Sequence, residues 1–383
     1  MKVYDDNAIN GEVLLGSTMT NQDGEYSIII ENDLSQDENG YDIVVKVCSD
    51  GNHAVVVNSL CEVYELSNDE IIYNIDTDVS LIKVDFNIDN DRFNSYHSSF
   101  QIHQALLMAY DFILDIDDLV MDKILTHYPS TGTNYDATFI YHDYVCINIF
   151  KDDYCDWDVI QHEYGHYVQD EYNISQSPGG YHTYNNLADA RNNKVDGLNL
   201  AWGEGWATFF AISLQKYFNG VTLNIPNVGN DIYNDTLDYE LNMNIELLKV
   251  NNNFIRLGEA SELNVSGVLY DFFDNKEETI DNIQYSIQDI WEVVVNNNCT
   301  NISMFVNEFF GYDINRDIDI GKILSDSGFS AYNISSSYDN DKNKISINWN
   351  AGGGSNIFPN NQFNINFYDK DYSIIYKKRK LII

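Results

Sequence analysis

One short segment of the chain, His162-Glu163-Tyr164-Gly165-His166, combines two histidines and a glutamate at a chemically useful spacing. Side chains four residues apart lie on the same face of a helix, so both imidazoles can bind one metal ion. Glu163 follows the first histidine, where its carboxylate can reach a water molecule activated by that ion. Apolar residues at helical spacing flank the segment, in 157–160 and 167–168, and Asp156 is the expected N-cap. The segment therefore predicts a helix that carries half of a zinc site and its catalytic base.

A site with two histidines needs a third protein ligand. Asp170 and Glu171 lie at least one turn further along the same helix, so they cannot close around the same ion. His182 is possible, but it lies in a polar stretch with glycine and asparagine that is typical of a loop. Glu204 is the strongest candidate, because of the sequence around it.

Glu204 is the only charged residue between Leu198 and Gln215, in a segment that is apolar on nearly every face. Such a segment is typical of a buried helix, and a buried carboxylate without a partner is costly. A metal ion is one of the few partners that would hold it ionised; an arginine or lysine partner is the alternative, although basic residues are scarce. Small residues on the Glu204 face would let the histidine helix approach closely: Ala201, Ala207, Thr208 and Ala211.

The two segments together, 162–166 and Gly203-Glu204-Gly205-Trp206, resemble the gluzincin class of zinc metallopeptidases, especially its fungalysin-like members. The resemblance covers about residues 139–218 and continues more weakly to 274. It implies three zinc ligands and one general base and proton shuttle: His162, His166 and Glu204, and Glu163. It also implies an α+β fold with a zincin-type core, in which a cleft separates an upstream sheet-containing lobe from a downstream helical lobe.

Two positions distinguish the chain from related patterns. The metzincin pattern requires Gly at position 169 and His at position 172, where this chain has Gln169 and Tyr172, so that class is excluded. Fungalysin-like peptidases usually place an Asp four residues after the ligand glutamate, where it orients a ligand histidine. This chain has Thr208 there. The partner that orients that histidine is therefore left open, and such partners tune metal affinity.

The expected function is zinc-dependent hydrolysis of peptide bonds in a polypeptide substrate. Zinc lowers the pKa of its water toward about 7, and Glu163 accepts the proton as this water attacks the scissile carbonyl. Glu163 then protonates the leaving amine. Most gluzincins add a Tyr or His hydrogen-bond donor at the oxyanion, for which four residues remain open: Tyr172, His182, Tyr184 and Tyr270.

Two other functions are compatible with the same motifs. The chain could be a catalytically inactive surface adhesin or binding protein that retains a zincin fold, or a zinc hydrolase that acts on a non-peptide amide. Glu163 distinguishes an enzyme from an inactive metal-binding protein, because binding the metal does not require it.

Composition narrows the partners. The 383 residues include 60 acidic and 21 basic ones, a formal net charge of −39 that argues against binding nucleic acid or an anionic membrane. Surface carboxylates could bind calcium, and no stretch is long and apolar enough to span a membrane. We expect a secreted or cell-surface protein. No signal peptide is visible at the N-terminus, so we also expect that the chain begins inside a larger protein.

The five cysteines cannot all form disulfides within the chain. Cys48 with Cys61, or Cys146 with Cys155, could pair, but free buried thiols are favoured for these four and for Cys299.

The length and the alternation of apolar residues predict several domains. Residues 1–90 resemble an incomplete β-sandwich module of the carboxypeptidase-regulatory-like or transthyretin-like kind, with strands at 12–15, 18–20, 25–30 and 41–47. Residues 91–330 form the expected peptidase domain, and residues 331–383 resemble part of a fibronectin type III module, with strands at 345–349 and 362–367. Within 91–330 we expect helices at 100–125, 261–273, 283–295 and 302–310, paired strands at 137–141 and 146–149, and a loop at 170–199.

Overall fold

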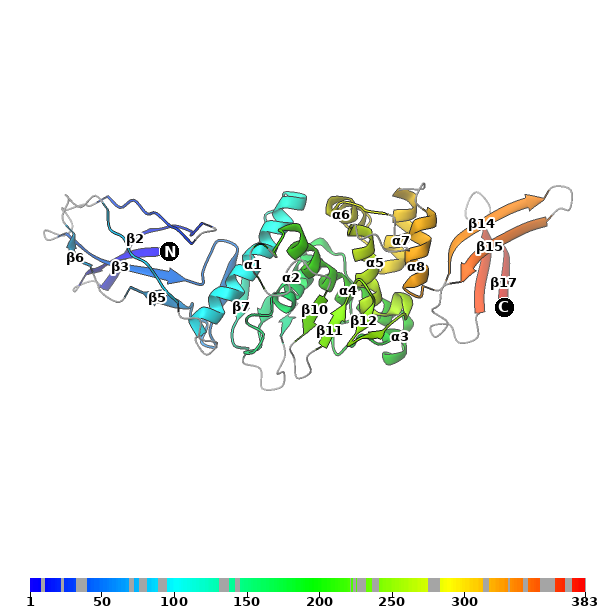
Figure 1. The fold of residues 1–383 in the computed structure, drawn as a ribbon, viewed down its shortest axis with the longest axis horizontal. Helices are drawn as coiled ribbons and strands as arrows, with labels where there is room; N and C mark the ends of the chain where they lie inside the picture. The colour runs from blue at the N-terminus through cyan, green and yellow to red at the C-terminus, as the bar shows by residue number, and fades with distance from the viewer. Residues whose placement is uncertain are drawn as a thin grey trace. The chain divides into compact units, whose positions relative to one another are not determined.

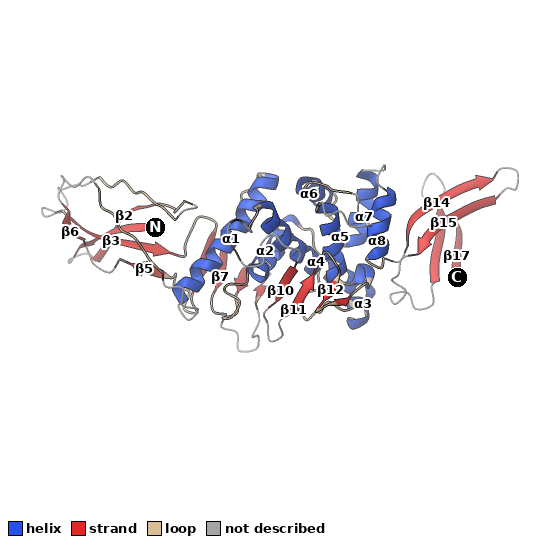
Figure 2. Ribbon diagram, in the orientation of Figure 1, coloured by secondary structure: helices blue, strands red, loops and turns tan. Residues whose placement is uncertain are grey.

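The structure is a computed structural model. It describes residues 1–7, 11–21, 24–31, 40–68, 72–75, 81–88, 95–130, 138–141, 145–220, 222, 225, 232–235, 241–274, 283–312, 317–329, 331–339, 344–351, 362–368 and 374–382. Groups of strands and groups of helices follow one another along the chain, and the strands form several separate sheets (Figures 1 and 2). This mixed α and β composition is compatible with the expected α+β class.

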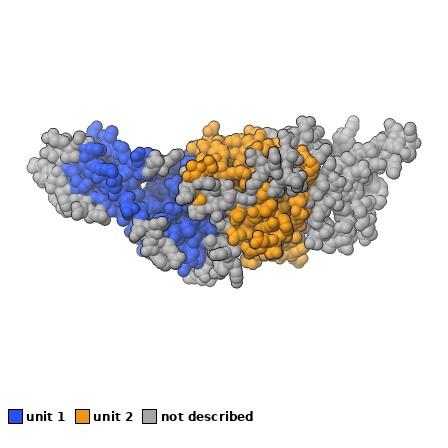
Figure 3. All heavy atoms as spheres, viewed as in Figure 1, with its two compact units in different colours: residues 1–111, 119–160 blue, residues 112–118, 161–383 orange. Residues whose placement is uncertain are grey.

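The chain forms two compact units (Figure 3). Unit 1 contains residues 1–111 and 119–160, and unit 2 contains residues 112–118 and 161–383. The domain boundaries expected near residues 90 and 330 remain predictions.

The first sheet of unit 1 is antiparallel and has the strand order β2-β1-β3-β5, with β6 also paired to β3. Its apolar side chains alternate along the strands and form one core cluster, which includes Val3, Ile43 and Val45. The strands are β1 (Lys2–Asn7), β2 (Gly11–Ser17), β3 (Tyr41–Cys48), β5 (Glu65–Ser67) and β6 (Ile72–Ile75).

Two of the strands expected in this region are not strands. Residues 18–20 and 25–30 lie outside the sheet ladders, although Tyr26, Ile28 and Ile30 pack against its core cluster. The Tyr26 hydroxyl donates to the carbonyl oxygen of Val84 at 2.7 Å. The alternation in 25–30 therefore identified the side chains that face the core, but a backbone ladder requires a neighbouring strand, which alternation does not supply.

The second sheet of unit 1 has the order β4-β7-β9-β8, in which β4, β7 and β9 are parallel and β8 is antiparallel to β9. The paired strands expected at 137–141 and 146–149 are confirmed as β8 and β9, although Ala137 lies outside the described residues. The strands are β4 (Ala54–Val57), β7 (Ile124–His127), β8 (Phe139–Tyr141) and β9 (Cys146–Asn148).

The helix expected at 100–125 was wrong at both ends, because α1 spans Ser95–Asp117 and Leu125 belongs to β7. Asp118 ends the helix with a left-handed backbone at φ 54°, a conformation that Asp tolerates better than most residues.

Unit 2 contains most of the helices and a meander of four strands (Figure 1). Helices that were expected at 261–273 and 302–310 are present as α5 and α7. The helix expected at 283–295 is present as α6, but it begins only at Ile287, because Ser286 is its N-cap. The loop expected at 170–199 was wrong in part: α2 continues to Tyr172, residues 187–190 form the short helix α3, and Asn193 caps a helix that already begins at Lys194.

The bounds in unit 2 are as follows. The helices are α2 (Trp157–Tyr172), α3 (Leu187–Ala190), α4 (Lys194–Tyr217), η1 (Gly258–Ala260), α5 (Glu262–Phe273), α6 (Ile287–Asn296), α7 (Ile302–Tyr312) and α8 (Asp317–Asp326). Only the part of α2 from residue 161 onward belongs to unit 2. The meander strands are β10 (Ile232–Asp235), β11 (Leu241–Asn244), β12 (Lys249–Val250) and β13 (Asn253–Phe254).

Strands expected near the C-terminus are also present. The strands expected at 345–349 and 362–367 are β15 (Lys344–Ala351) and β16 (Gln362–Tyr368). Each pairs antiparallel with a strand that was not expected, β15 with β14 (Ala331–Asp339) and β16 with β17 (Ile374–Ile382).

All five cysteines are free, so neither candidate disulfide forms. Cys48, Cys146 and Cys299 are buried as expected, whereas Cys61 and Cys155 are exposed, contrary to the expectation. Among the described residues, no helix has the length and apolar character needed to cross a membrane.

One histidine makes unit 1 sensitive to acid. His103 on α1 is buried, and its Nε2 lies 3.2 Å from the carbonyl oxygen of Ala54, to which the neutral ring donates. Burial lowers the pKa of His103 to about 4. The unfolded chain, with an ordinary histidine pKa of about 6.5, therefore binds more protons than the folded chain between about pH 6.5 and pH 4. Stability must fall as the pH falls through this window.

We predict that this single group lowers the free energy of unfolding by about 2 kcal/mol between pH 7 and pH 5. The substitution His103→Gln removes the titration, so the variant should lose less stability over that range than the wild type. Urea unfolding at both pH values measures the difference. Parallel losses in the two proteins would contradict the neutral state of His103.

Candidate metal centre

Helix α2 presents the two histidines of the motif on one face. Asp156 precedes the helix, and its side-chain oxygen accepts a hydrogen bond from the backbone N–H of Val159 at 3.4 Å, so the expected N-cap is confirmed. His162 and His166 are both buried, with their rings edge to face at a centroid distance of 4.8 Å.

Helix α4 brings Glu204 to these histidines. The side chain of Asn193 caps the helix by accepting from the N–H groups of Val195 and Asp196. The approach of α2 to α4 is close at Gly165, where a β-carbon would lie only 3.1 Å from Cα of Ala207. Of the small residues expected to let the histidine helix approach, Ala207 lies at this contact and Thr208 contacts His162.

Three donor atoms from the two helices lie at nearly equal distances. Nε2 of His162 and Nε2 of His166 are 3.1 Å apart. They lie 3.2 Å and 3.1 Å, respectively, from the same oxygen of Glu204, Oε2. In the part of the chain that the structure describes, His162, His166 and Glu204 form a group whose donor atoms are close enough together to hold one metal ion. His182 is not part of that group.

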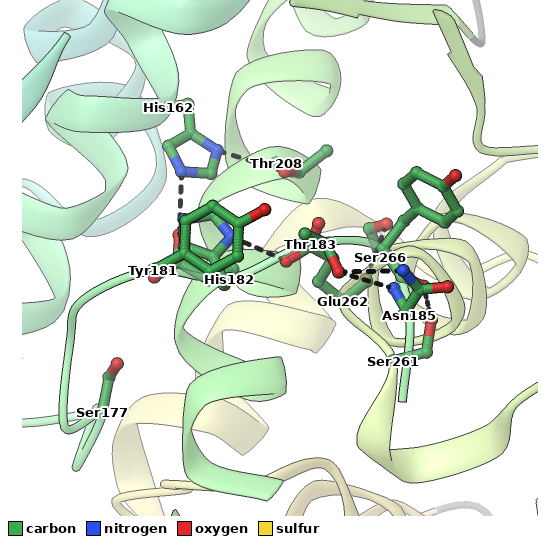
Figure 4. Close-up of polar contacts among 12 residues, drawn as sticks. His162, Ser177, Tyr181, His182, Thr183, Asn185, Thr208, Ser261, Glu262 and Ser266 are labelled. Carbon is green, nitrogen blue, oxygen red and sulfur yellow. Dashed lines mark hydrogen bonds and ion pairs between the residues drawn. The ribbon is translucent and has the colours of Figure 1, made fainter. Parts of the chain in front are cut away.

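The outer nitrogen of each histidine is also fixed. Nδ1 of His162 lies 3.1 Å from the hydroxyl oxygen of Thr208 (Figure 4), and Nδ1 of His166 lies 3.1 Å from Oε1 of Gln169. Gln169 in turn donates from Nε2 to the carbonyl oxygen of Gly203 at 2.9 Å. When each Nδ1 carries the proton and donates it, the lone pair of each Nε2 is free to bind a metal ion.

Thr208, at the position where the resemblance led us to expect an aspartate, is therefore the partner of His162. A hydroxyl oxygen accepts the Nδ1–H bond as an aspartate oxygen would, but without a negative charge. The partner that the sequence left open is thus a neutral one.

His182 lies beside the three donors without joining them. Its Nε2 is 3.4 Å from Oε2 of Glu204, and its Nδ1 is 2.9 Å from Oε2 of Glu262, at the start of α5 (Figure 4). The side chain of His182 is 36% exposed, whereas that of Glu204 is 8% exposed. Glu262 therefore orients the ring of His182, and the other ring nitrogen is directed toward the centre.

Three buried carboxylates, those of Glu163, Glu204 and Glu262, gather around these histidines. Among the described residues, the ion pairs of Glu204 are all with histidines, so the arginine or lysine partner that the sequence left open is not found there. Burial alone would raise the pKa of Glu204, but His182 and His166 outweigh it and hold that pKa well below its ordinary value. The centre is therefore built around an ionised carboxylate.

The histidine protons supply the positive charge when no metal ion is present. Burial lowers the pKa of His166, but the charge of Glu204 outweighs it and raises that pKa to about 9. Burial also lowers the pKa of His182, and Glu204 and Glu262 raise it to about 10. Burial raises the pKa of Glu163, which His166 and His162 partly offset. A cation in this centre thus replaces bound protons.

Of the four residues considered as oxyanion donors, His182 is the one in contact with the metal-binding group. Tyr172 donates to Asp117 at 2.5 Å, and the hydroxyl of Tyr270 accepts from Lys216 at 3.1 Å. Tyr184 contributes its backbone carbonyl oxygen to a hydrogen bond from Ser261.

Sequence reasoning missed two contributors to the centre. Gln169 was considered only as evidence against another class, although its spacing of three residues from His166 on one helix predicts contact. Tyr233 on β10 packs against His162 with a ring-centroid distance of 5.8 Å, and no pattern in the sequence links these two residues.

We predict that Glu204→Ala removes metal binding, whereas His182→Ala keeps it. Glu204 supplies one of the three converging atoms, while His182 stands outside the group and is partly exposed. Elemental analysis of the purified variants measures the metal content. Full metal content in Glu204→Ala would remove Glu204 from the ligand set.

We also predict that Thr208→Val weakens metal binding roughly 10- to 100-fold, because Nδ1 of His162 loses its acceptor. Thr208→Ser retains a hydroxyl and should bind nearly as tightly as the wild type. Competition with a chromophoric chelator gives both affinities. If the valine and serine variants bound the metal equally well, the contact would have no role in orienting His162.

Comparison with known protein families and with curated proteins gave no match for this chain.

Proposed function

We propose that this chain is a zinc-dependent peptidase of the gluzincin type. The observation that supports this most is the convergence of two imidazole nitrogens and one carboxylate oxygen from His162, His166 and Glu204. All three side chains are buried, and the nitrogen that each histidine turns away from the centre has its own hydrogen-bond partner.

The donor set fits zinc. Two imidazoles and one carboxylate are the protein ligands of many hydrolytic zinc sites, which leave a fourth position open. In a tetrahedral site with bonds of about 2.0–2.1 Å, neighbouring ligand atoms lie roughly 3.3–3.4 Å apart. The distances of 3.1–3.2 Å between the three donor atoms are close to this value.

Glu163 is the residue proposed to move protons. A zinc ion held by the three ligands would acidify a water molecule and polarise the scissile carbonyl. Glu163 lies next to a ligand in sequence but is not one of the three donors, so its carboxylate remains available as a base. It takes the proton of the attacking water and then passes it to the leaving amine.

His182 is the proposed hydrogen-bond donor to the carbonyl oxygen of the substrate. Glu262 holds its Nδ1, and its Nε2 faces the centre 3.4 Å from the ligand oxygen of Glu204. A donor fixed in this way stabilises the negative charge that develops on the carbonyl oxygen during attack.

The remaining family expectations belong to the same proposal. The zincin-type core, the cleft between two lobes, the polypeptide substrate, the secreted or cell-surface location and bound calcium are proposed from the resemblance and the composition. The antiparallel pair β8 and β9 directly upstream of α2 and the succession of α2 and α4 are compatible with such a core.

The test uses Glu163→Gln in the full chain. Because an amide cannot accept the proton, hydrolysis of an unfolded protein substrate should fall by roughly 10²–10⁴-fold. Zinc content should stay at the wild-type level, because Glu163 is not a ligand. Glu171→Gln is the matched control, since Glu171 lies on the same helix and is exposed. Mass spectrometry of the digest measures the cleavage.

The result separates the enzyme from the alternatives. Equal cleavage by wild type and Glu163→Gln would reject the role of Glu163. A wild-type protein that holds zinc but cleaves no unfolded protein would favour the inactive binding protein or the hydrolase of a non-peptide amide.

A further inference from the structure

The segment that carries His182, residues 174–186, connects α2 to α3 without regular secondary structure; it is called the strap below. Its start is fixed, because the indole nitrogen of Trp202 donates to the carbonyl oxygen of Ile174 at 2.7 Å. Its end is also fixed, since Ser261 donates to the carbonyl oxygen of Tyr184 and Asn186 caps α3. Between these anchors, the strap is held by the contact of His182 with Glu262 and by a second contact closer to its middle.

Arg191 makes that contact. Its Nη2 donates to the carbonyl oxygen of Gly179 at 2.5 Å and to that of Tyr181 at 3.1 Å. Gly179 and Gly180 both have left-handed backbones, with φ 62° and 86°. Glycine adopts this conformation without the penalty that a β-carbon brings. A β-carbon at position 180 would also lie 3.4 Å from Nη2 of Arg191.

The base of this contact is rigid. Arg191 is the C-cap of α3, and its backbone N–H donates to the carbonyl oxygen of Leu187. Helix α3 is pressed against α4 at Gly197, where a β-carbon would lie 2.4 Å from Cα of Ala188. The guanidinium therefore ties the strap to the end of α3, and α3 packs against α4, the helix that carries Glu204.

We propose that Arg191 is a positioning residue that holds the strap so that His182 faces the metal centre. This inference rests on the proposed function, in which His182 donates to the substrate carbonyl. Glu262 fixes the ring of His182 through Nδ1, but the ring is partly exposed, and the backbone on which it stands is irregular. Arg191 fixes that backbone one residue before His182, at the carbonyl of Tyr181.

The first arm of the test measures the strap directly. In Arg191→Gln, hydrogen exchange of peptides that cover residues 178–184 should become roughly 10-fold faster, because a strap released from Arg191 opens more often and exposes its amides, including the N–H of Gly179 that donates to Ser177. Gly180→Ala should also speed exchange in these peptides, because a β-carbon disfavours the left-handed backbone of residue 180 next to Arg191. Arg256→Gln is the matched control, since Arg256 bonds to Asp326 and not to the strap. Unchanged exchange in Arg191→Gln would overturn the proposal.

The second arm uses a double-mutant cycle on peptide cleavage. Arg191→Gln should leave zinc content unchanged and lower kcat/KM about tenfold or more, with the loss in kcat, and Arg191→Lys should lie in between. In a His182→Ala background the same substitution should change kcat/KM less than about twofold, because Arg191 acts through His182. An equal loss in both backgrounds would overturn the proposal.

The two arms keep this inference separate from the proposed function. If the wild type cleaved no peptide, the proposed function would fail, and with it the role of Arg191 in catalysis. The exchange experiment would still decide whether Arg191 holds the strap. If cleavage depended on Glu163 but not on Arg191, the peptidase would stand and the positioning role would fall.

Discussion

The burial of an ionised carboxylate between two helices is the constraint on which this part of the molecule depends. Glu204 has buried imidazoles as its ion-pair partners on α2, and a charge in that position is stable only with such compensation. The imidazoles can reach it because α2 and α4 touch at Gly165 and Ala207. Close packing of α2 against α4 therefore brings the imidazoles to Glu204, and the imidazoles in turn allow the charge of Glu204 to be buried.

The orientation of the histidines follows from the same helix pair. Thr208 and the carbonyl of Gly203 both belong to α4, and they fix His162 directly and His166 through Gln169. A sliding of α2 along α4 would break these hydrogen bonds together with the alignment of the donor atoms. The acceptors are neutral, so they set the direction of the rings without adding to the negative charge of the centre.

The strap that carries His182 differs from the helices around it, because it has no regular secondary structure. A β-carbon at Gly205 would lie 2.6 Å from the carbonyl oxygen of Glu262, so α5 also lies close against α4. The three donor atoms thus stand on regular helices, whose side chains are held precisely in place by packing. His182 stands on an irregular segment, where a few hydrogen bonds decide its position. The three donor atoms are therefore held by helix packing, whereas His182 is held by the hydrogen bonds that Glu262 and Arg191 make.

The sequence by itself identified the three residues that converge at the centre and much of the local structure. The spacing of His162 and His166 requires a helix if both are to act together, and the isolation of Glu204 in an apolar segment required a buried partner. The N-cap at Asp156 was predicted correctly, because a cap depends only on residues close by in the sequence. Only the tertiary structure decided what lies between distant segments: the contact of Thr208 with His162, the pairing of His182 with Glu262, and the hold of Arg191 on the strap. The alternation in 25–30 likewise could not supply a partner strand. Local patterns record which side chains must be buried, whereas the partner of each buried group depends on how the chain brings separate elements together.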